Sequence, residues 1–107
     1  MPAFKERREA FEARYAHDEM LTFKAKARTA RRAGLWAAQE MGLAAAQAES
    51  LAGQLVEAQV TKGEGAGLFD RIRAEFAQSG LPHSESYVRR RLEAIAADTE
   101  AETRKDG

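Results

Sequence analysis

The sequence predicts an all-α protein, a four-helix bundle with a projecting, marginally stable N-terminal helical segment. Of the 107 residues, 44% are hydrophobic, many of them alanine, and only two are proline, a composition that favours helices over sheets. Apolar residues recur at helical spacings of three and four in successive stretches. Short connections separate these stretches, which is typical of antiparallel neighbours in a bundle.

The N-terminal segment from Phe4 to Asp18 is amphipathic, with one narrow aromatic stripe. Phe4, Phe11 and Tyr15 are spaced by seven and four residues, so a helix places them on one face, and charged residues surround them. The segment's opposite-charge pairs have the weaker orientation, and a free helix of about 15 residues frays. Such a helix suits a groove on a partner protein, although the pattern equally allows it to fold back onto its own bundle.

The remainder of the chain is expected to form the bundle itself. Apolar spacing continues through Met20, Phe23, Ala27, Ala30 and Gly34, which predicts a helix packed along its length that ends before Gly42. Further helices are predicted from Ala44 to Val60, from Leu68 to Ser79-Gly80, and after an N-cap at Ser84, with a loop from Thr61 to Gly67. The last helix is expected to turn Tyr87, Val88, Leu92 and Ile95 inward and to lose its pattern from Asp98. The expected core includes Phe23, Trp36, Leu55, Phe69, Ile72, Phe76, Leu92 and Ile95. These patterns divide the chain into a partner-binding segment (1–18), a four-helix globular domain (19–103) and a polar tail (104–107).

Charge is balanced overall but divided along the chain. The 17 basic and 17 acidic residues cancel, while residues 1–32 carry a net charge of +4 and residues 33–107 a net charge of −4. Lys24, Arg28, Arg31 and Arg32 share one helical face, a candidate patch for an anion or a nucleotide. A solvated face, or one paired with the acidic remainder of the bundle, is favoured over such a patch, because the chain has no net positive charge and no aromatic residues interleave with the bases.

Signals for catalysis, metal binding or membrane insertion are weak. His17 and His83 lie far apart in the sequence, and the GEGAG run lacks the Lys-Ser/Thr that completes a phosphate-binding loop. We therefore expect no enzyme activity, no metal site and no cofactor. Cysteine is absent and no apolar run approaches membrane-spanning length, so we expect a cytoplasmic protein.

Three adjacent motifs resemble those of a known family. AFEARYAHDE (Ala10 to Glu19), LTFKAKAR (Leu21 to Arg28) and GLWAAQEMGL (Gly34 to Leu43) resemble the alphaproteobacterial ATPase inhibitor family, the zeta subunit of the F-type ATP synthase. The resemblance runs without gaps from Phe4 to about Phe69 and more loosely to the end of the fourth helix.

This resemblance implies an inhibitor of ATP hydrolysis. The family's N-terminal segment inserts at a catalytic α/β interface of the synthase head, near the rotor stalk, and blocks rotation in the hydrolytic direction. The implied partners are the α, β and rotor-stalk subunits, and weak adenine-nucleotide binding is implied as well. The inhibitory motif corresponds here to Phe4, Arg7, Ala10, Phe11, Glu12, Arg14, Tyr15, His17 and Asp18.

The chain departs from the family pattern at several positions. Lys5 and Met20 stand where acids are usual, Thr29 replaces a usual Arg, the charge order at Arg8-Glu9 is reversed, and Gly65 to Gly67 replace an acidic stretch. Charge reversal in a docking segment costs affinity when the facing charge is unchanged. The alternative function is therefore a helical adaptor, a diverged paralogue that binds another protein or a nucleotide.

Overall fold

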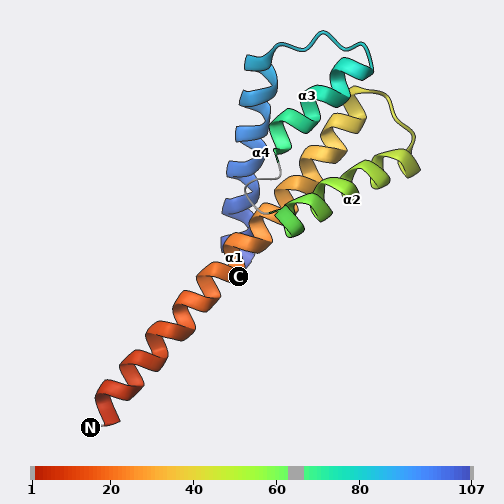
Figure 1. Cartoon of the computed structure of the whole chain (residues 1–107). Coiled ribbons are helices and arrows are strands. Elements are labelled where there is room, and N and C mark those ends of the chain that lie inside the picture. Colours follow the sequence, from red (N-terminus) through yellow and green to blue (C-terminus); the bar gives the residue numbers. More distant parts are fainter. Residues whose placement is uncertain (1, 63–66, 107) are drawn as a thin grey trace.

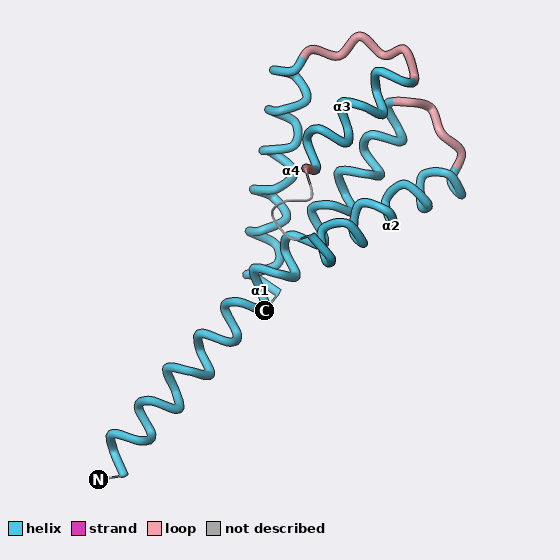
Figure 2. Tube along the Cα trace, viewed as in Figure 1, coloured by secondary structure: helices cyan, strands magenta, loops and turns pink. Residues whose placement is uncertain are grey.

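The computed structural model describes residues 2–62 and 67–106, with side chains from residue 12 onward. Four helices follow one another along the chain, and the described residues contain no strand, so the predicted all-α class is confirmed (Figures 1 and 2). The helices are α1 (Pro2–Glu40), α2 (Ala45–Lys62), α3 (Leu68–Gln78) and α4 (Glu85–Asp106).

Helix α1 gives the molecule its elongated shape. Its N-terminal half projects from the body, while its C-terminal half packs among the other helices (Figure 1). A helix of 39 residues is about 58 Å long, which accounts for most of the 66 Å dimension of a molecule only 27 × 24 Å across. The predicted projecting segment is thus confirmed, and its marginal stability in isolation stays a prediction.

Small residues let α1 occupy the centre of the body. Its alanines at positions 30, 33, 37 and 38 are completely buried, and α2 and α4 are its principal neighbours. At Gly34 the α1 and α2 backbones approach so closely that an added Cβ would lie 2.8 Å from the Cα atom of Ala52. Larger side chains from α2, α3 and α4, among them Leu55, Ile72 and Val88, complete the core.

The predicted core is correct except at its N-terminal end and at Tyr87, which was expected to turn inward but is 38% exposed, because its hydroxyl donates a hydrogen bond to the Glu40 carboxylate at 2.7 Å. Leu55, Ile72, Phe76 and Leu92 are buried, Trp36 and Phe69 pack against the core, and Ile95 is half-buried. Phe23 is 55% exposed and Met20 is 65% exposed, so the prediction that these two side chains face the core is wrong. Helix α2 ends at Lys62, too early to cover them, and burial of α1 begins instead at Leu21 and Ala25 on another face.

The helix ends follow the predicted capping signals closely. Gly42 has a positive φ of 69°, and the Leu43 N–H donates to the carbonyl of Ala38 at 2.9 Å, as in a Schellman motif. Ser84 caps α4 as predicted, since its Oγ accepts a hydrogen bond from the Tyr87 N–H at 3.1 Å. The predicted loop from Thr61 begins later, because α2 continues to Lys62, and residues 63–66 lie outside the described residues.

The fourth helix is longer than its apolar pattern predicts. It continues to Asp106, so the expected loss of helical pattern from Asp98 is wrong. Thr99 and Thr103 are buried there, because the guanidinium groups of Arg32 and Arg28 donate hydrogen bonds to their hydroxyls. Polar contacts with α1 therefore continue the packing where apolar residues stop.

None of the helices in the described part of the chain is both long and apolar enough to span a bilayer.

Candidate functional site

The projecting half of α1 is the surface most available to a partner. From Glu12 to Met20 every side chain is exposed, including the predicted partner-binding residues Glu12, Arg14, Tyr15, His17 and Asp18. The side chains of the other four, Phe4, Arg7, Ala10 and Phe11, lie outside the described residues, although the backbone there is helical. We call residues 2–20 the arm.

Tyr15 is the one member of the predicted aromatic stripe whose environment is described. It is 59% exposed, so its ring is not folded back into the bundle. Its hydroxyl is hydrogen-bonded to Glu19 one turn along, and this bond, together with the negative charge of Glu19, raises the pKa of Tyr15. The phenol therefore stays neutral at physiological pH, and its ring face remains free for an apolar contact.

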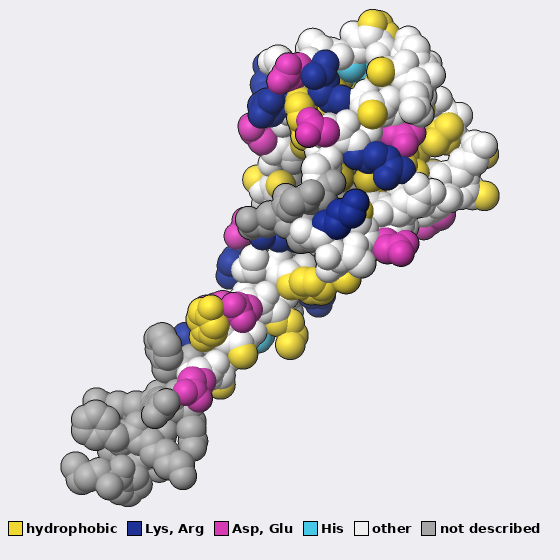
Figure 3. Space-filling view, in the orientation of Figure 1, with side chains coloured by type: hydrophobic (Ala, Val, Ile, Leu, Met, Phe, Trp, Pro, Cys, Tyr) yellow, Lys and Arg dark blue, Asp and Glu magenta, His cyan; other side chains and the backbone are white. Residues whose placement is uncertain are grey.

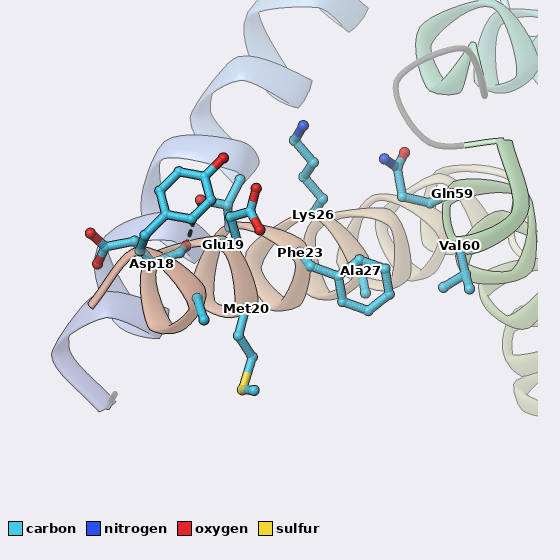
Figure 4. A pocket seen from close by; sticks show the side chains of 11 residues that line it. Asp18, Glu19, Met20, Phe23, Lys26, Ala27, Gln59 and Val60 are labelled. Atoms are coloured by element: carbon cyan, nitrogen blue, oxygen red, sulfur yellow. Dashed lines mark hydrogen bonds between the residues drawn. The ribbon is translucent and has the colours of Figure 1, made fainter. Parts of the chain in front are cut away.

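A groove lies where the arm meets the body. It has a volume of about 930 Å³ and lies between α1 and the last turn of α2. Phe23 and Ala27 of α1 lie on the side of the groove toward Val60 of α2, while Met20 extends from the arm (Figure 4). The lining residues are Tyr15, Ala16, Asp18, Glu19, Met20, Thr22, Phe23, Lys26, Ala27, Gln59 and Val60.

Exposed apolar side chains gather at this groove. Among the described residues five large hydrophobic side chains are exposed, and four of them, Tyr15, Met20, Phe23 and Val60, line it. Hydrophobic side chains are visible on the surface of the arm and at its junction with the body (Figure 3). Contiguous exposed apolar surface of this kind marks interaction sites. Helical spacing predicted Phe23 and Met20 in the core and did not mark Val60, because spacing along one helix does not show how far a neighbouring helix extends beside it.

The basic face of α1 is largely engaged with the body. Arg31 donates two hydrogen bonds to the carboxylate of Glu49, at 2.9 and 3.0 Å, and this pairing lowers the pKa of Glu49. Arg32 pairs with Glu102. Arg28 also reaches α4, where its Nη1 lies 3.6 Å from the carboxylate of Asp106.

Of the predicted patch, only Lys24 is exposed on α1 with no ion pair to the body in the described structure. Three of the four basic side chains of the predicted patch therefore lie beside carboxylates of the body.

Neither histidine belongs to a cluster of metal ligands. His17 is exposed on the arm, while the ring of His83 packs against Phe76 and Tyr87, with centroid distances of 5.1 and 4.9 Å. The Nε2 of His83 is buried 3.8 Å from the Glu40 carboxylate. No group of three His, Cys, Asp or Glu side chains in the described part of the chain is placed to hold a metal ion.

These features define an all-α fold in which a compact helical body carries a projecting helical arm. The model of the family described as ATPase inhibitor subunit zeta matches residues 1–102, nearly the whole chain, and the chain belongs to this family. This membership supports a role as an ATPase inhibitor. No curated protein and no solved structure matches the chain significantly.

Proposed function

We propose that the chain inhibits ATP hydrolysis by the F-type ATP synthase, and that its N-terminal helix inserts at a catalytic α/β interface of the head. Wedged there, near the rotor stalk, the helix blocks rotation in the hydrolytic direction. In this role the chain is not itself an enzyme, because it makes and breaks no covalent bond. It works on the cytoplasmic side, where it binds the soluble head.

The observation that carries the proposal is the exposure of the described side chains of the arm. Between Glu12 and Met20 no side chain is buried in the body, and burial starts only at Leu21. Exposed aromatic surface costs free energy in water, about 25 cal/mol for each Å² that is not buried, so a partner's cleft is its natural location. The 18 residues of the predicted inhibitory segment span about 27 Å as a helix, which is enough to enter a cleft between subunits.

The separation of arm and body supplies the test. A variant lacking residues 1–18 is expected to keep the helical content and unfolding temperature of the body, because the buried core lies outside the deleted segment. It should lose inhibition of the purified cognate synthase. Full inhibition by the shortened chain would overturn the proposed insertion of the N-terminal helix, whereas no inhibition by the unaltered chain would favour the helical adaptor.

A single substitution refines the same test. Tyr15→Ala removes an exposed ring, so it should change the free energy of unfolding by less than about 0.5 kcal/mol. Aromatic residues at the centre of an interface contribute about 2 kcal/mol or more, so the half-inhibitory concentration should rise about 30-fold. The control is Arg90→Ala, which shortens an exposed side chain on α4, away from the arm, and should leave inhibition unchanged.

A further inference from the structure

One buried nitrogen atom of the body has no hydrogen bond. Among the described residues, the Nε2 atom of His83 is the only buried side-chain nitrogen or oxygen without a hydrogen-bond partner. Buried polar atoms are nearly always paired, so an unpaired one calls for an explanation. The carboxylate of Glu40 faces this nitrogen, and its Oε1 lies 3.8 Å away, beyond hydrogen-bonding distance. The imidazole ring is therefore held beside a carboxylate to which it is not bonded.

This pair joins two segments that are far apart in the chain, at the end of the body opposite the arm (Figure 1). Glu40 is the last residue of α1, and His83 lies in the connection between α3 and α4. The imidazole ring packs edge-on against the ring of Phe76 on α3 and is tilted against the ring of Tyr87 on α4. A bond between His83 and Glu40 would therefore tie the α3–α4 connection to the C-terminal end of α1.

The groups around His83 favour a positive charge on its ring. Glu40 faces it from α1 and Tyr87 from α4, while α3 presents the uncharged ring of Phe76. The Tyr87 hydroxyl donates a hydrogen bond to Glu40 at 2.7 Å. This bond, then burial and the charge of Glu40, raises the pKa of Tyr87 against a smaller opposing effect of Arg91, so the phenol stays neutral. A carboxylate has about four lone-pair sites, so Glu40 can accept a second hydrogen bond.

Two helix ends act in the same direction. Glu40 ends α1, Phe76 lies in the last turn of α3, and neither last turn contains a basic residue. The C-terminal end of a helix carries a partial negative charge, which a nearby cation stabilises. A protonated His83 supplies a positive charge beside both of these helix ends.

We propose that His83 is a protonation-dependent latch between the α3–α4 connection and the end of α1. The neutral ring carries one N–H, whereas the protonated ring carries an N–H on both nitrogens, so its Nε2 can donate to Glu40. Shortening the separation from 3.8 Å to about 2.8 Å completes this charge-assisted hydrogen bond. Histidines ordinarily gain a proton between pH 8 and pH 5, where glutamate carboxylates remain ionised. The latch therefore closes on mild acidification.

The latch makes the stability of the body depend on pH. Its bond to Glu40 exists only in the folded, protonated chain, so acidification through the histidine range stabilises the fold. His83→Gln takes up no proton and should lose this gain. Relative to that variant, the Tm of the unaltered chain should rise by about 4 °C or more between pH 8 and pH 5.5. His83→Phe, which keeps the ring contacts but takes up no proton, should behave in the same way.

The second histidine of the chain provides the matched control. His17 is exposed on the arm, so His17→Gln should leave the pH dependence of Tm as it is in the unaltered chain. The inference is overturned if the difference in Tm between the unaltered chain and both His83 variants is the same at pH 8 and pH 5.5.

Nuclear magnetic resonance detects the bond itself. At pH 5.5 the Nε2–H hydrogen of His83 should give a resolved signal, because bonding and burial protect it from exchange with water. Glu40→Ala removes the acceptor and should abolish the signal, whereas Tyr87→Phe removes only the other donor and should keep it. No signal from the unaltered chain, or a signal that persists in Glu40→Ala, would refute the latch. Neither measurement involves a partner protein, so the latch and the proposed function are tested separately.

Discussion

The close approach of α1 and α2 predicts opposite effects for the same substitution at two glycines. Both Gly34 and Gly53 lie inside helices, so replacing either with alanine gains about 0.8–1.0 kcal/mol of helix propensity. At Gly53 the new Cβ would have no atom within 4 Å apart from the adjoining backbone of its own helix, whereas at Gly34 it would lie 2.8 Å from the Ala52 Cα and 3.0 Å from a methyl group of Leu55. The methyl group can rotate away, but the backbone atom cannot.

The difference in stability between the two variants follows from the gain in helix propensity and the cost of overpacking. Overpacking of a tight interface costs about 1–3 kcal/mol, which equals or exceeds the propensity gain at Gly34. Gly53→Ala should therefore stabilise the protein by up to about 1 kcal/mol, and Gly34→Ala should change its stability by about 0 to −2 kcal/mol. For a domain of this size 1 kcal/mol corresponds to about 4 °C or more in Tm, so the two variants should differ by about 4–12 °C.

Thermal unfolding followed by circular dichroism measures this difference directly, and urea unfolding gives the free energies. Equal Tm values for the two variants would refute the reasoning, because the helix propensity term is common to both. A stabilised Gly34→Ala variant would show that α1 and α2 do not approach as closely as the structure places them.

Two further predictions concern α4. Ser84→Ala removes the side-chain acceptor of the Tyr87 N–H and should cost about 1 kcal/mol, measured by urea unfolding; an unchanged midpoint would show that another group caps the helix. A hydrogen bond from Arg32, and after it the positive charge of Arg32, lowers the pKa of Glu102 below its ordinary value of 4.5. The stability that this pair contributes is therefore present above pH 4.5 and is lost as the pH falls through the lowered pKa. The stability difference between the unaltered chain and Glu102→Gln should therefore shrink between pH 7 and pH 3, and a constant difference across this range would contradict the assignment.

Local signals in the sequence were sufficient for the helices and most of their ends. Gly42 and Ser84 marked a helix stop and a helix start, because a left-handed residue and a side-chain cap satisfy backbone groups within a few residues of themselves. Burial of Ile72 and Phe76 also followed from helical spacing alone, since α3 has one strongly apolar face.

The candidate site was only partly predictable. Tyr15 was correctly placed on a projecting helix, and the family motifs pointed to the arm that carries it. Phe23 was misplaced because helical spacing reports which face of a helix is apolar, and does not report whether another element covers it. No sequence pattern marked Val60 as part of the candidate site, because it belongs to the site only once the fold places it in the same groove as Phe23.

By itself the sequence determined the helices, their caps and the family to which the chain belongs, because these depend on side chains that are near one another along the chain. Tertiary structure alone decided where the core ends. The register set by Gly34 and Ala52 stops α2 short of Met20, and arginines of α1 bury Thr99 and Thr103 where no apolar pattern remains. Both outcomes depend on how far one helix extends beside another, and that length is a property of the packed molecule.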